Sequence, residues 1–214
     1  MHNRKKSKRT GWAFALLAAM LLLAACGAGA GGGVGPDGAN GAGPGGAGAN
    51  GKAGAGGSGP DGAIRVVTTI AQIAEPLSVI GGGRVQVTSL MGPGVDPHLY
   101  QASQSDIRKL GNADVIFYNG LHLEANMLRA FEEIGKRRPV LAVGEAIPED
   151  RLLADGTGAV DPHVWFDIEL WKEALGAAVE ELKKLSPDDA AFFEANKRDY
   201  FAKMDELKEE AVRK

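Results

Sequence analysis

The sequence predicts an α/β fold in which helices flank a parallel β-sheet, and two observations support this fold class. Short runs of β-branched and aromatic residues alternate, from Ile64 onward, with longer segments whose apolar residues recur at helical spacing. This alternation is typical of parallel strands joined by helical crossovers. Residues 1–62 lack the pattern, and the remaining residues, about 150, are enough to bury one hydrophobic core.

Residues 1–26 have the features of an export signal. Basic residues precede the apolar stretch Gly11–Ala25, which is shorter than the roughly 20 residues that span a bilayer. The stretch ends in Leu23-Ala24-Ala25-Cys26, which resembles the lipobox of bacterial lipoproteins. We therefore expect Cys26, the only cysteine, to carry a lipid. The alternatives are an ordinary signal peptide with an incidental cysteine, or an N-terminal anchor helix.

Residues 27–62 are predicted to be a flexible tether, because glycine occupies 18 of these 36 positions. A glycine at every third position occurs only in two runs that are out of phase, and proline is scarce, which argues against a collagen triple helix. As a Gly-rich coil, the segment would have an r.m.s. reach of roughly 30–35 Å. That reach would hold a folded domain clear of a membrane surface.

The folded part begins with a predicted buried strand at Ile64–Ile70, which is short and rich in β-branched residues. A helix follows at Ala71–Ile80, where three glycines end it. Val85–Met91 is predicted to be the second strand. After a loop rich in glycine and proline, Ser105 can cap a second helix.

The third predicted strand is Asp114–Tyr118, and the fourth is Pro139–Val143. Between them, apolar residues at helical spacing over 123–134 predict a third helix that ends at Gly135. Ligands of parallel α/β sheets bind beyond the carboxyl ends of the strands. The loop that follows the second strand contains His98, which therefore lies on the expected side of the sheet.

Two helices complete the prediction. Asp167 can cap a helix over 168–185 whose apolar residues form one buried face. Ser186 is predicted to cap a further helix that Pro187 opens. The second helix places Phe193, Tyr200, Met204, Leu207 and Ala211 on one face and continues to Lys214.

The strongest chemical signal is a repeated tripeptide, Asp96-Pro97-His98 and Asp161-Pro162-His163. Neutral imidazole is the commonest protein ligand of transition metals. Each proline fixes φ just before its histidine and stiffens the loop. Each aspartate can hold its loop by an Asx-type hydrogen bond or orient an imidazole that binds a metal.

We therefore predict that His98 and His163 bind one metal ion, with imidazole nitrogens within about 4 Å of each other. A single loop histidine is usually solvated or structural, and this alternative stays open for each of them. His122 follows a predicted strand and is interpreted as a packed or capping residue. His2 lies in the export signal and is not a candidate.

Charge and motif content argue against two classes of function. Five of the 24 basic residues and none of the 27 acidic residues lie in residues 1–25, so the remainder has a formal net charge of −8. Such a chain lacks the basic footprint of nucleic-acid binding. HExxH, GxSxG and P-loop motifs do not occur in the sequence, so we expect no enzyme. A metal-dependent hydrolase stays open as an alternative; it would need an open coordination position and a general base.

Four motifs, in this order along the chain, resemble the metal-binding solute-binding lipoproteins of manganese and zinc ABC transporters: Gly92–Tyr100, Asn112–Asp114, Tyr118–Glu124 and Asp161–Trp165. The resemblance covers residues 64–214. It implies two α/β lobes joined by one long helix, with the metal between them and two ligands from each lobe. His98 and His163 match the two ligand positions of the first lobe, whereas His122 matches a position that is not usually a ligand.

The resemblance also implies a function, a location and partners. The chain would be an extracytoplasmic lipoprotein, anchored to the bacterial cell membrane through Cys26, that captures Mn2+ or Zn2+ as a transported ligand. It would deliver the metal to the permease of an ABC importer as a monomer, without a nucleic-acid partner. The loop before Asp161 lacks the His-rich insertion of many zinc-specific relatives, which favours manganese. Some members of the family are described as adhesins, so a surface adhesin with a structural metal is the other alternative.

The expected organisation is a lipoprotein signal peptide at 1–26, a tether at 27–62, an N-terminal metal-binding lobe at 63–186 and the start of the inter-lobe helix at 187–214. The second α/β lobe and its two ligands have no counterpart in the sequence. We therefore expect the chain to be an N-terminal fragment. Because two histidines leave an ion half-coordinated, we expect residues 63–214 to bind Mn2+ or Zn2+ at micromolar or poorer affinity.

Overall fold

The computed structural model describes residues 59, 62–154 and 156–213, which belong to one compact unit. The predicted export signal, Cys26 and nearly all of the predicted tether lie outside the described residues. Four parallel strands form one sheet in the order β2-β1-β3-β4. Their bounds are Ile64–Thr68 for β1, Val85–Ser89 for β2, Val115–Tyr118 for β3 and Val140–Ala142 for β4.

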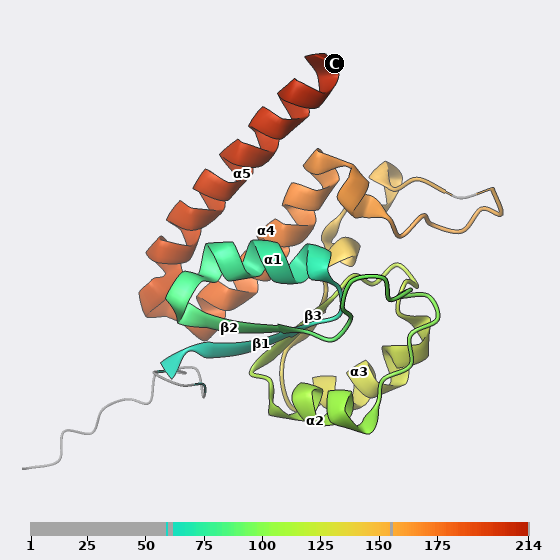
Figure 1. Ribbon diagram of the computed structural model, residues 1–214, viewed down its shortest axis with the longest axis vertical. Coiled ribbons are helices and arrows are strands. Elements are labelled where there is room, and N and C mark those ends of the chain that lie inside the picture. Colours follow the sequence, from blue (N-terminus) through green and yellow to red (C-terminus); the bar gives the residue numbers. More distant parts are fainter. Residues whose placement is uncertain (1–58, 60–61, 155, 214) are drawn as a thin grey trace, which may run out of the picture. The chain divides into compact units, whose positions relative to one another are not determined.

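Helices cover both faces of this sheet, which confirms the predicted fold class (Figure 1). On one face lie α1 and α4, with α5 packed against both, and on the other lie α2 and α3. The helices are α1 at Ala71–Gly81, α2 at Gln104–Asn112, α3 at Leu128–Gly135, α4 at Ile168–Leu185 and α5 at Ala190–Arg213. Short 3-10 helices lie at Gly82–Arg84, Ala125–Met127, Val143–Ala146, Glu149–Arg151, Val164–Phe166 and Pro187–Asp189.

The core lies on both faces of the central strands. Val115, Ile116 and Phe117 of β3 are completely buried, and Val66 of β1 is nearly so. Adjacent residues of a strand point to opposite faces, so a strand that is buried throughout needs helices on both sides. This requirement explains why the central strands are continuously apolar.

The register brings the carboxyl ends of the strands to one edge of the sheet. Thr68 at the end of β1 pairs with Ser89 at the end of β2 and with Phe117 of β3. Tyr118 at the end of β3 pairs with Ala142 at the end of β4. The loops that follow β1, β2 and β3 therefore begin side by side, and the first Asp-Pro-His tripeptide lies in one of them.

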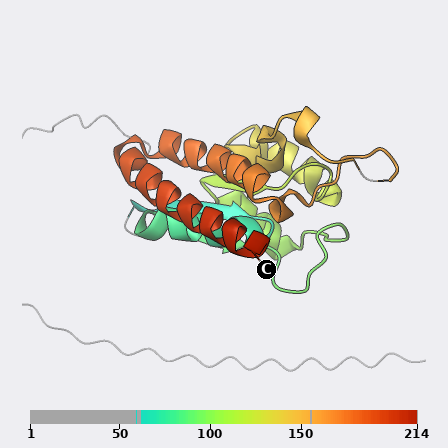
Figure 2. The same cartoon turned by 90° about the horizontal axis from the view of Figure 1, so that it is seen from above.

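Helix α5 is well covered over its first half and exposed beyond it. Phe193 is completely buried, and Asn196 Nδ2 donates a hydrogen bond of 2.8 Å to the carbonyl of Ile80 at the end of α1. Figure 2 shows α5 running beside α4. Tyr200 and Met204 are partly buried, whereas Leu207 and Val212 are 61% and 81% exposed.

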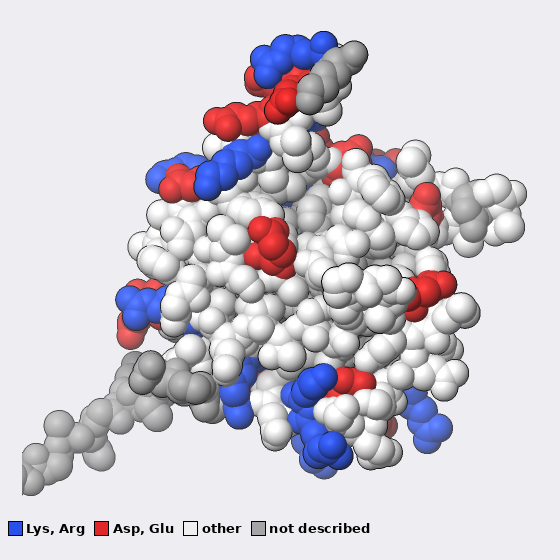
Figure 3. All heavy atoms as spheres, in the orientation of Figure 1, with Lys and Arg blue, Asp and Glu red and all other residues white. Residues whose placement is uncertain are grey.

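The exposure of the last turns follows from the position of α4. Lys208 of α5 forms an ion pair with Glu169 in the first turn of α4, at 2.8 Å. Since α4 begins at Ile168, it does not extend beside the residues of α5 beyond Lys208. The predicted apolar face of this helix is therefore covered at Phe193 and left exposed at Leu207. Figure 3 shows acidic and basic side chains interspersed along this end of α5.

Three predicted helix starts differ from the structure. The cap of α2 is Ser103 and not Ser105, because Ser103 Oγ accepts the Asp106 N–H and the Asp106 carboxylate accepts the Ser103 N–H. Leu123 lies in a turn, and α3 begins only at Leu128. The Ser186 hydroxyl donates to the Asp189 carboxylate and caps no backbone N–H. The predicted cap of α4 is confirmed, since Asp167 Oδ1 accepts two backbone N–H groups.

None of the helices in the described residues is both long enough and apolar enough to cross a membrane.

Candidate metal centre

The two Asp-Pro-His tripeptides meet beyond the carboxyl edge of the sheet. His98 Nε2 lies 3.3 Å from His163 Nε2, although 65 residues separate them in the chain. Two imidazole nitrogens at about 2.0–2.1 Å from one tetrahedral metal ion lie about 3.4 Å apart. The predicted proximity of these two rings is therefore confirmed, and their separation suits two ligands of one ion.

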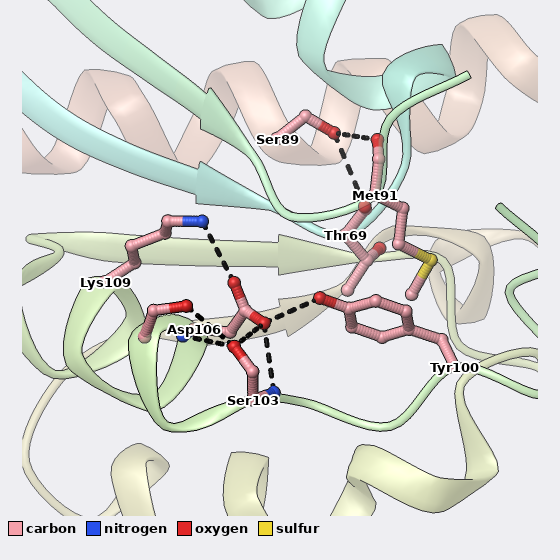
Figure 4. Close-up of polar contacts among 8 residues, drawn as sticks. Thr69, Ser89, Met91, Tyr100, Ser103, Asp106 and Lys109 are labelled. Carbon is pink, nitrogen blue, oxygen red and sulfur yellow. Dashed lines mark hydrogen bonds and ion pairs between the residues drawn. The ribbon is translucent and has the colours of Figure 1, made fainter.

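The loop that carries His98 is anchored where it leaves the sheet (Figure 4). Ser89, the last residue of β2, donates its hydroxyl to the Met91 carbonyl at 3.0 Å and to the Thr69 carbonyl at 3.4 Å. The Met91 N–H donates to the same Thr69 carbonyl at 2.9 Å. These bonds hold the end of β2 against the residue that follows β1.

The other end of the same loop is anchored at the start of α2 (Figure 4). Asp106 is nearly buried and accepts hydrogen bonds from Tyr100 Oη at 2.8 Å, Ser103 Oγ at 2.6 Å and Lys109 Nζ at 2.9 Å. Burial acts to raise the pKa of Asp106, but the hydrogen bonds from Ser103, Lys109 and Tyr100 outweigh it and hold the pKa well below its usual range. Burial and the Asp106 carboxylate raise the pKa of Tyr100 to about 12. Asp106 is thus ionised and binds the loop firmly at neutral pH.

The loop that carries His163 leads directly into α4. A 3-10 helix at Val164–Phe166 follows the histidine, and Asp167 then caps α4. The His163 ring meets the Trp165 ring edge-on, with centroids 5.2 Å apart. The histidine is therefore placed by a rigid helix start on one side and by an aromatic contact beside it.

Both aspartates form the predicted Asx-type turn. The His98 N–H donates to Asp96 Oδ1 at 2.9 Å, and the His163 N–H donates to Asp161 Oδ1 at 3.0 Å. Asp161 Oδ1 also lies 2.6 Å from His163 Nδ1. A carboxylate in that position keeps the proton on Nδ1 and leaves the Nε2 lone pair free for a metal.

The two histidine rings open onto a cavity of about 270 Å³ at the start of α1. Met91, the Gly92–Asp96 loop and Trp165 line it together with both histidines. Beside the site, Leu99 and Phe166 are 74% and 82% exposed. The site is thus solvent-accessible and has apolar side chains at its border.

The described residues supply two candidate ligands. Among them, no group of three or more His, Cys, Asp and Glu side chains is placed to hold a metal ion. His122 is exposed, and no described contact joins it to His98 or His163. Its backbone φ is 65°, in the left-handed region, which fits a turn residue.

Sequence reasoning missed two buried polar residues beneath the site, Asn119 and Glu124. Asn119 Nδ2 donates to the carbonyl of Pro162, the residue before His163, at 3.0 Å. Glu124 accepts the N–H groups of Asn119 and Gly120. Burial raises the pKa of Glu124, although hydrogen bonds from Thr69, Asn119 and Gly120 oppose the rise. A glutamate six residues after the end of a strand, just past a glycine turn, is the one sequence signal that could have drawn attention to this pair.

Comparison with known proteins identifies the family. The family model of ZnuA, the periplasmic component A of the zinc-uptake complex, matches residues 66–214. The chain is 48% identical over 141 residues to the manganese-binding lipoprotein MntA of Bacillus subtilis, covering 65% of this chain and 46% of MntA. It is 46% identical over 147 residues to the zinc-binding protein TroA of Treponema pallidum, covering 69% of this chain and 48% of TroA.

Solved structures agree with the sequence matches. The periplasmic zinc-binding protein TroA from Treponema pallidum superposes with a TM-score of 0.66 at 45% identity, over 68% of this chain and 52% of that one. The Zn(II)-bound AdcA from Streptococcus pneumoniae gives a TM-score of 0.61 at 25% identity, over 68% and 31% of the two chains. The chain spans about half the length of the curated relatives it matches. Because the family model matches more than half of the chain, the chain belongs to the family of ZnuA, the zinc-uptake complex component A.

Proposed function

We propose that the chain captures Mn2+ or Zn2+ through His98 and His163 and delivers it to the permease of an ABC importer. The observation that carries this proposal is the 3.3 Å separation of the two Nε2 atoms, which suits two ligands of one ion. The names of its relatives support it, since MntA is a manganese-binding lipoprotein and TroA a zinc-binding protein. These names give no support to the hydrolase or adhesin alternatives.

Asp161 and Asp96 have supporting roles in this proposal. Asp161 orients the His163 ring, and both aspartates fix the backbone of their histidines. The remaining coordination positions of the ion are filled by water or by groups outside the described residues. Further carboxylate ligands would favour manganese and a further histidine would favour zinc, so the remaining ligands decide between the two metals.

The location and organisation belong to the same proposal. Residues 1–26 direct export, Cys26 carries the lipid, and residues 27–62 form the tether to an extracytoplasmic lobe at 63–186, which 187–214 continue as a linking helix. A relative from Streptococcus anginosus is named a manganese ABC transporter substrate-binding lipoprotein, which supports both the lipid anchor and the permease partner. The protein acts as a monomer and catalyses no reaction.

Calorimetric titration of the full chain with Mn2+ and Zn2+ tests the metal site. The double variant His98→Ala, His163→Ala should lose at least about 100-fold in affinity, because both ligands are removed. His122→Ala is the matched control, since this exposed histidine lies in a neighbouring loop and should leave the affinity unchanged. Unchanged binding by the double variant would refute the site.

Membrane fractionation tests the anchor. In a lipoprotein-exporting bacterium the wild-type chain should pellet with membranes, and Cys26→Ala should appear in the soluble fraction. A variant that stays with the membranes after detergent-free washing would show that Cys26 is not the anchor.

A further inference from the structure

Asn119 connects the sheet to the second histidine loop. It follows β3 directly and is completely buried. Its side-chain Nδ2 donates to the Pro162 carbonyl at 3.0 Å and to the Gly120 carbonyl at 3.1 Å. Both acceptors are carbonyl oxygens, so the amide nitrogen must face them, and the orientation of the side chain follows from the chemistry.

The hydrogen bond to the Pro162 carbonyl restrains the backbone position of His163. Pro162 is bonded to His163, and the proline ring fixes the φ of residue 162. The bond spans 43 residues of sequence, from the end of a central strand to the loop. Because β3 is a central, buried strand, this hydrogen bond ties the His163 loop to the centre of the sheet.

Glu124 fixes Asn119 in turn. Its carboxylate accepts the Asn119 N–H at 2.9 Å, the Gly120 N–H at 3.1 Å and the Thr69 hydroxyl at 2.6 Å. The Thr69 carbonyl accepts the N–H of Met91, where the His98 loop begins. One chain of hydrogen bonds therefore joins the start of the first histidine loop, through Thr69, Glu124 and Asn119, to the second.

The turn between Asn119 and Glu124 is held in an unfavourable conformation. Leu121 and His122 have φ of 53° and 65°, a region that non-glycine residues seldom adopt. Gly120 also has a positive φ, and a Cβ there would lie 2.8 Å from the Cβ of Ala142. A turn of this kind persists only where its surroundings over-determine it, and the Glu124 hydrogen bonds supply that constraint.

We propose that Asn119 is a positioning residue for the metal site, which sets the place of His163 relative to His98 through the Pro162 carbonyl, and that Glu124 holds Asn119 in position for this task. The inference rests on the proposed metal-binding function. A buried asparagine that merely satisfies a loop carbonyl would affect stability, whereas a positioning residue also affects the geometry of the ligand pair.

Asn119→Leu in the full chain is the main test, because leucine has a similar volume and donates no hydrogen bond. Asn119→Ser removes the same two bonds with a smaller, polar side chain and serves if the leucine variant does not fold. Asn196→Leu is the matched control. Asn196 also donates its Nδ2 to a backbone carbonyl from a partly buried position, but at the far end of α1.

Amide hydrogen exchange of the metal-free protein provides the first measurement. Exchange of residues 161–166 should rise by about fivefold in Asn119→Leu, as expected for the loss of one hydrogen bond that restrains the loop. Asn196→Leu should leave the exchange of residues 161–166 unchanged and should raise the exchange of amides near Ile80, which loses its hydrogen bond from Asn196. Equal exchange of residues 161–166 in the wild type and Asn119→Leu would overturn the proposal.

Zinc titration provides the second measurement. Asn119→Leu should weaken binding by about tenfold, in the range seen when outer partners of metal ligands are removed, and Asn196→Leu should not. The d–d absorption of bound Co2+ should change in shape for Asn119→Leu alone. If the wild type binds no metal, the proposed function fails, while the exchange measurement still decides the role of Asn119. If the wild type binds zinc and Asn119→Leu binds it with the same affinity and the same Co2+ spectrum, the positioning role alone is refuted.

Discussion

The two histidine loops carry the same tripeptide and use its aspartate differently. In both, the aspartate accepts the backbone N–H of the histidine two residues later. Asp161 also contacts the His163 ring at Nδ1, whereas no described hydrogen bond joins Asp96 to the His98 ring. The tripeptide thus determines the turn, and the surroundings of each loop determine whether the carboxylate acts on the imidazole.

The anchoring of the two loops differs in the same way. Ser89 anchors the first loop at one end and Asp106 at the other, and Asn126 Nδ2 donates to the His98 carbonyl at 3.4 Å. A distant residue, Asn119, and the capped start of α4 anchor the second. The first loop is therefore tied to the end of β2, the residue after β1 and the start of α2, whereas the second is tied to the residue after the central strand β3 and to the start of α4.

The largest expected effect is the difference in metal affinity between the Asp161 and Asp96 variants. Asp161→Ala should weaken metal binding by about 10–100-fold, because the His163 ring loses its orienting partner and its preferred tautomer. Asp96→Ala removes only the exposed hydrogen bond from the His98 N–H and should weaken metal binding by less than about threefold. Titration with Zn2+ compares the two variants, with Asp199→Ala as a control at an exposed aspartate of α5. Equal losses at positions 96 and 161 would contradict the asymmetry.

A second effect concerns the anchor of the first loop. Asp106→Asn should lower the free energy of unfolding by about 2 kcal/mol at pH 7, because hydrogen bonds to a charged group are lost. The pKa of Asp106 is lower in the folded state than the unfolded value of about 3.9, so its contribution is present above that pH and is lost as the pH falls.

Urea denaturation between pH 7 and pH 3 measures this dependence. The difference in stability between wild type and Asp106→Asn should narrow by about 1 kcal/mol from pH 5 to pH 3. A gap that stays constant over this range would mean that ionised Asp106 is not what anchors the loop.

The smallest effect tests the helix cap that ends the first loop. Ser103→Ala should destabilise the protein by about 1 kcal/mol, since its hydroxyl caps α2. Ser105→Ala, in the first turn of the same helix, should cost less than about 0.5 kcal/mol. Thermal unfolding of both variants decides between the two serines, and a larger loss at Ser105 would restore the original prediction.

Local patterns predicted most of the fold. All four predicted strands are present, and their bounds differ from the prediction by one or two residues. The first and second strands end two residues earlier than predicted, although Thr69 and Leu90 still donate backbone hydrogen bonds to the neighbouring strands. The spacing of Ser103 and Asp106 is a capping-box pattern that could have identified the correct cap. The apolar spacing over 123–134 could not reveal that the tight turn at Gly120–Leu123 uses its first residues.

The candidate site was predictable only in part. The repeated tripeptide identified both histidines because the sequence itself contains the repetition. The roles of Asn119 and Glu124 depend on partners 43 and 55 residues away, which no local pattern encodes. The difference between Asp96 and Asp161 likewise depends on ring orientation, which is a property of the packed structure.

The contact between the first and last helices has a consequence for the kinetics of folding. Asn196 reaches Ile80 across 116 residues, and Tyr200 reaches Glu75 across 125. Closing loops of that length is slow, because chain entropy opposes the contact until both ends are available. During synthesis, Ile73, Leu77 and Ile80 are made early, but the α5 residues that pack against their helix follow more than a hundred residues later. Until then the nascent chain exposes part of this apolar helix, and a chaperone that binds such surfaces has its longest opportunity there.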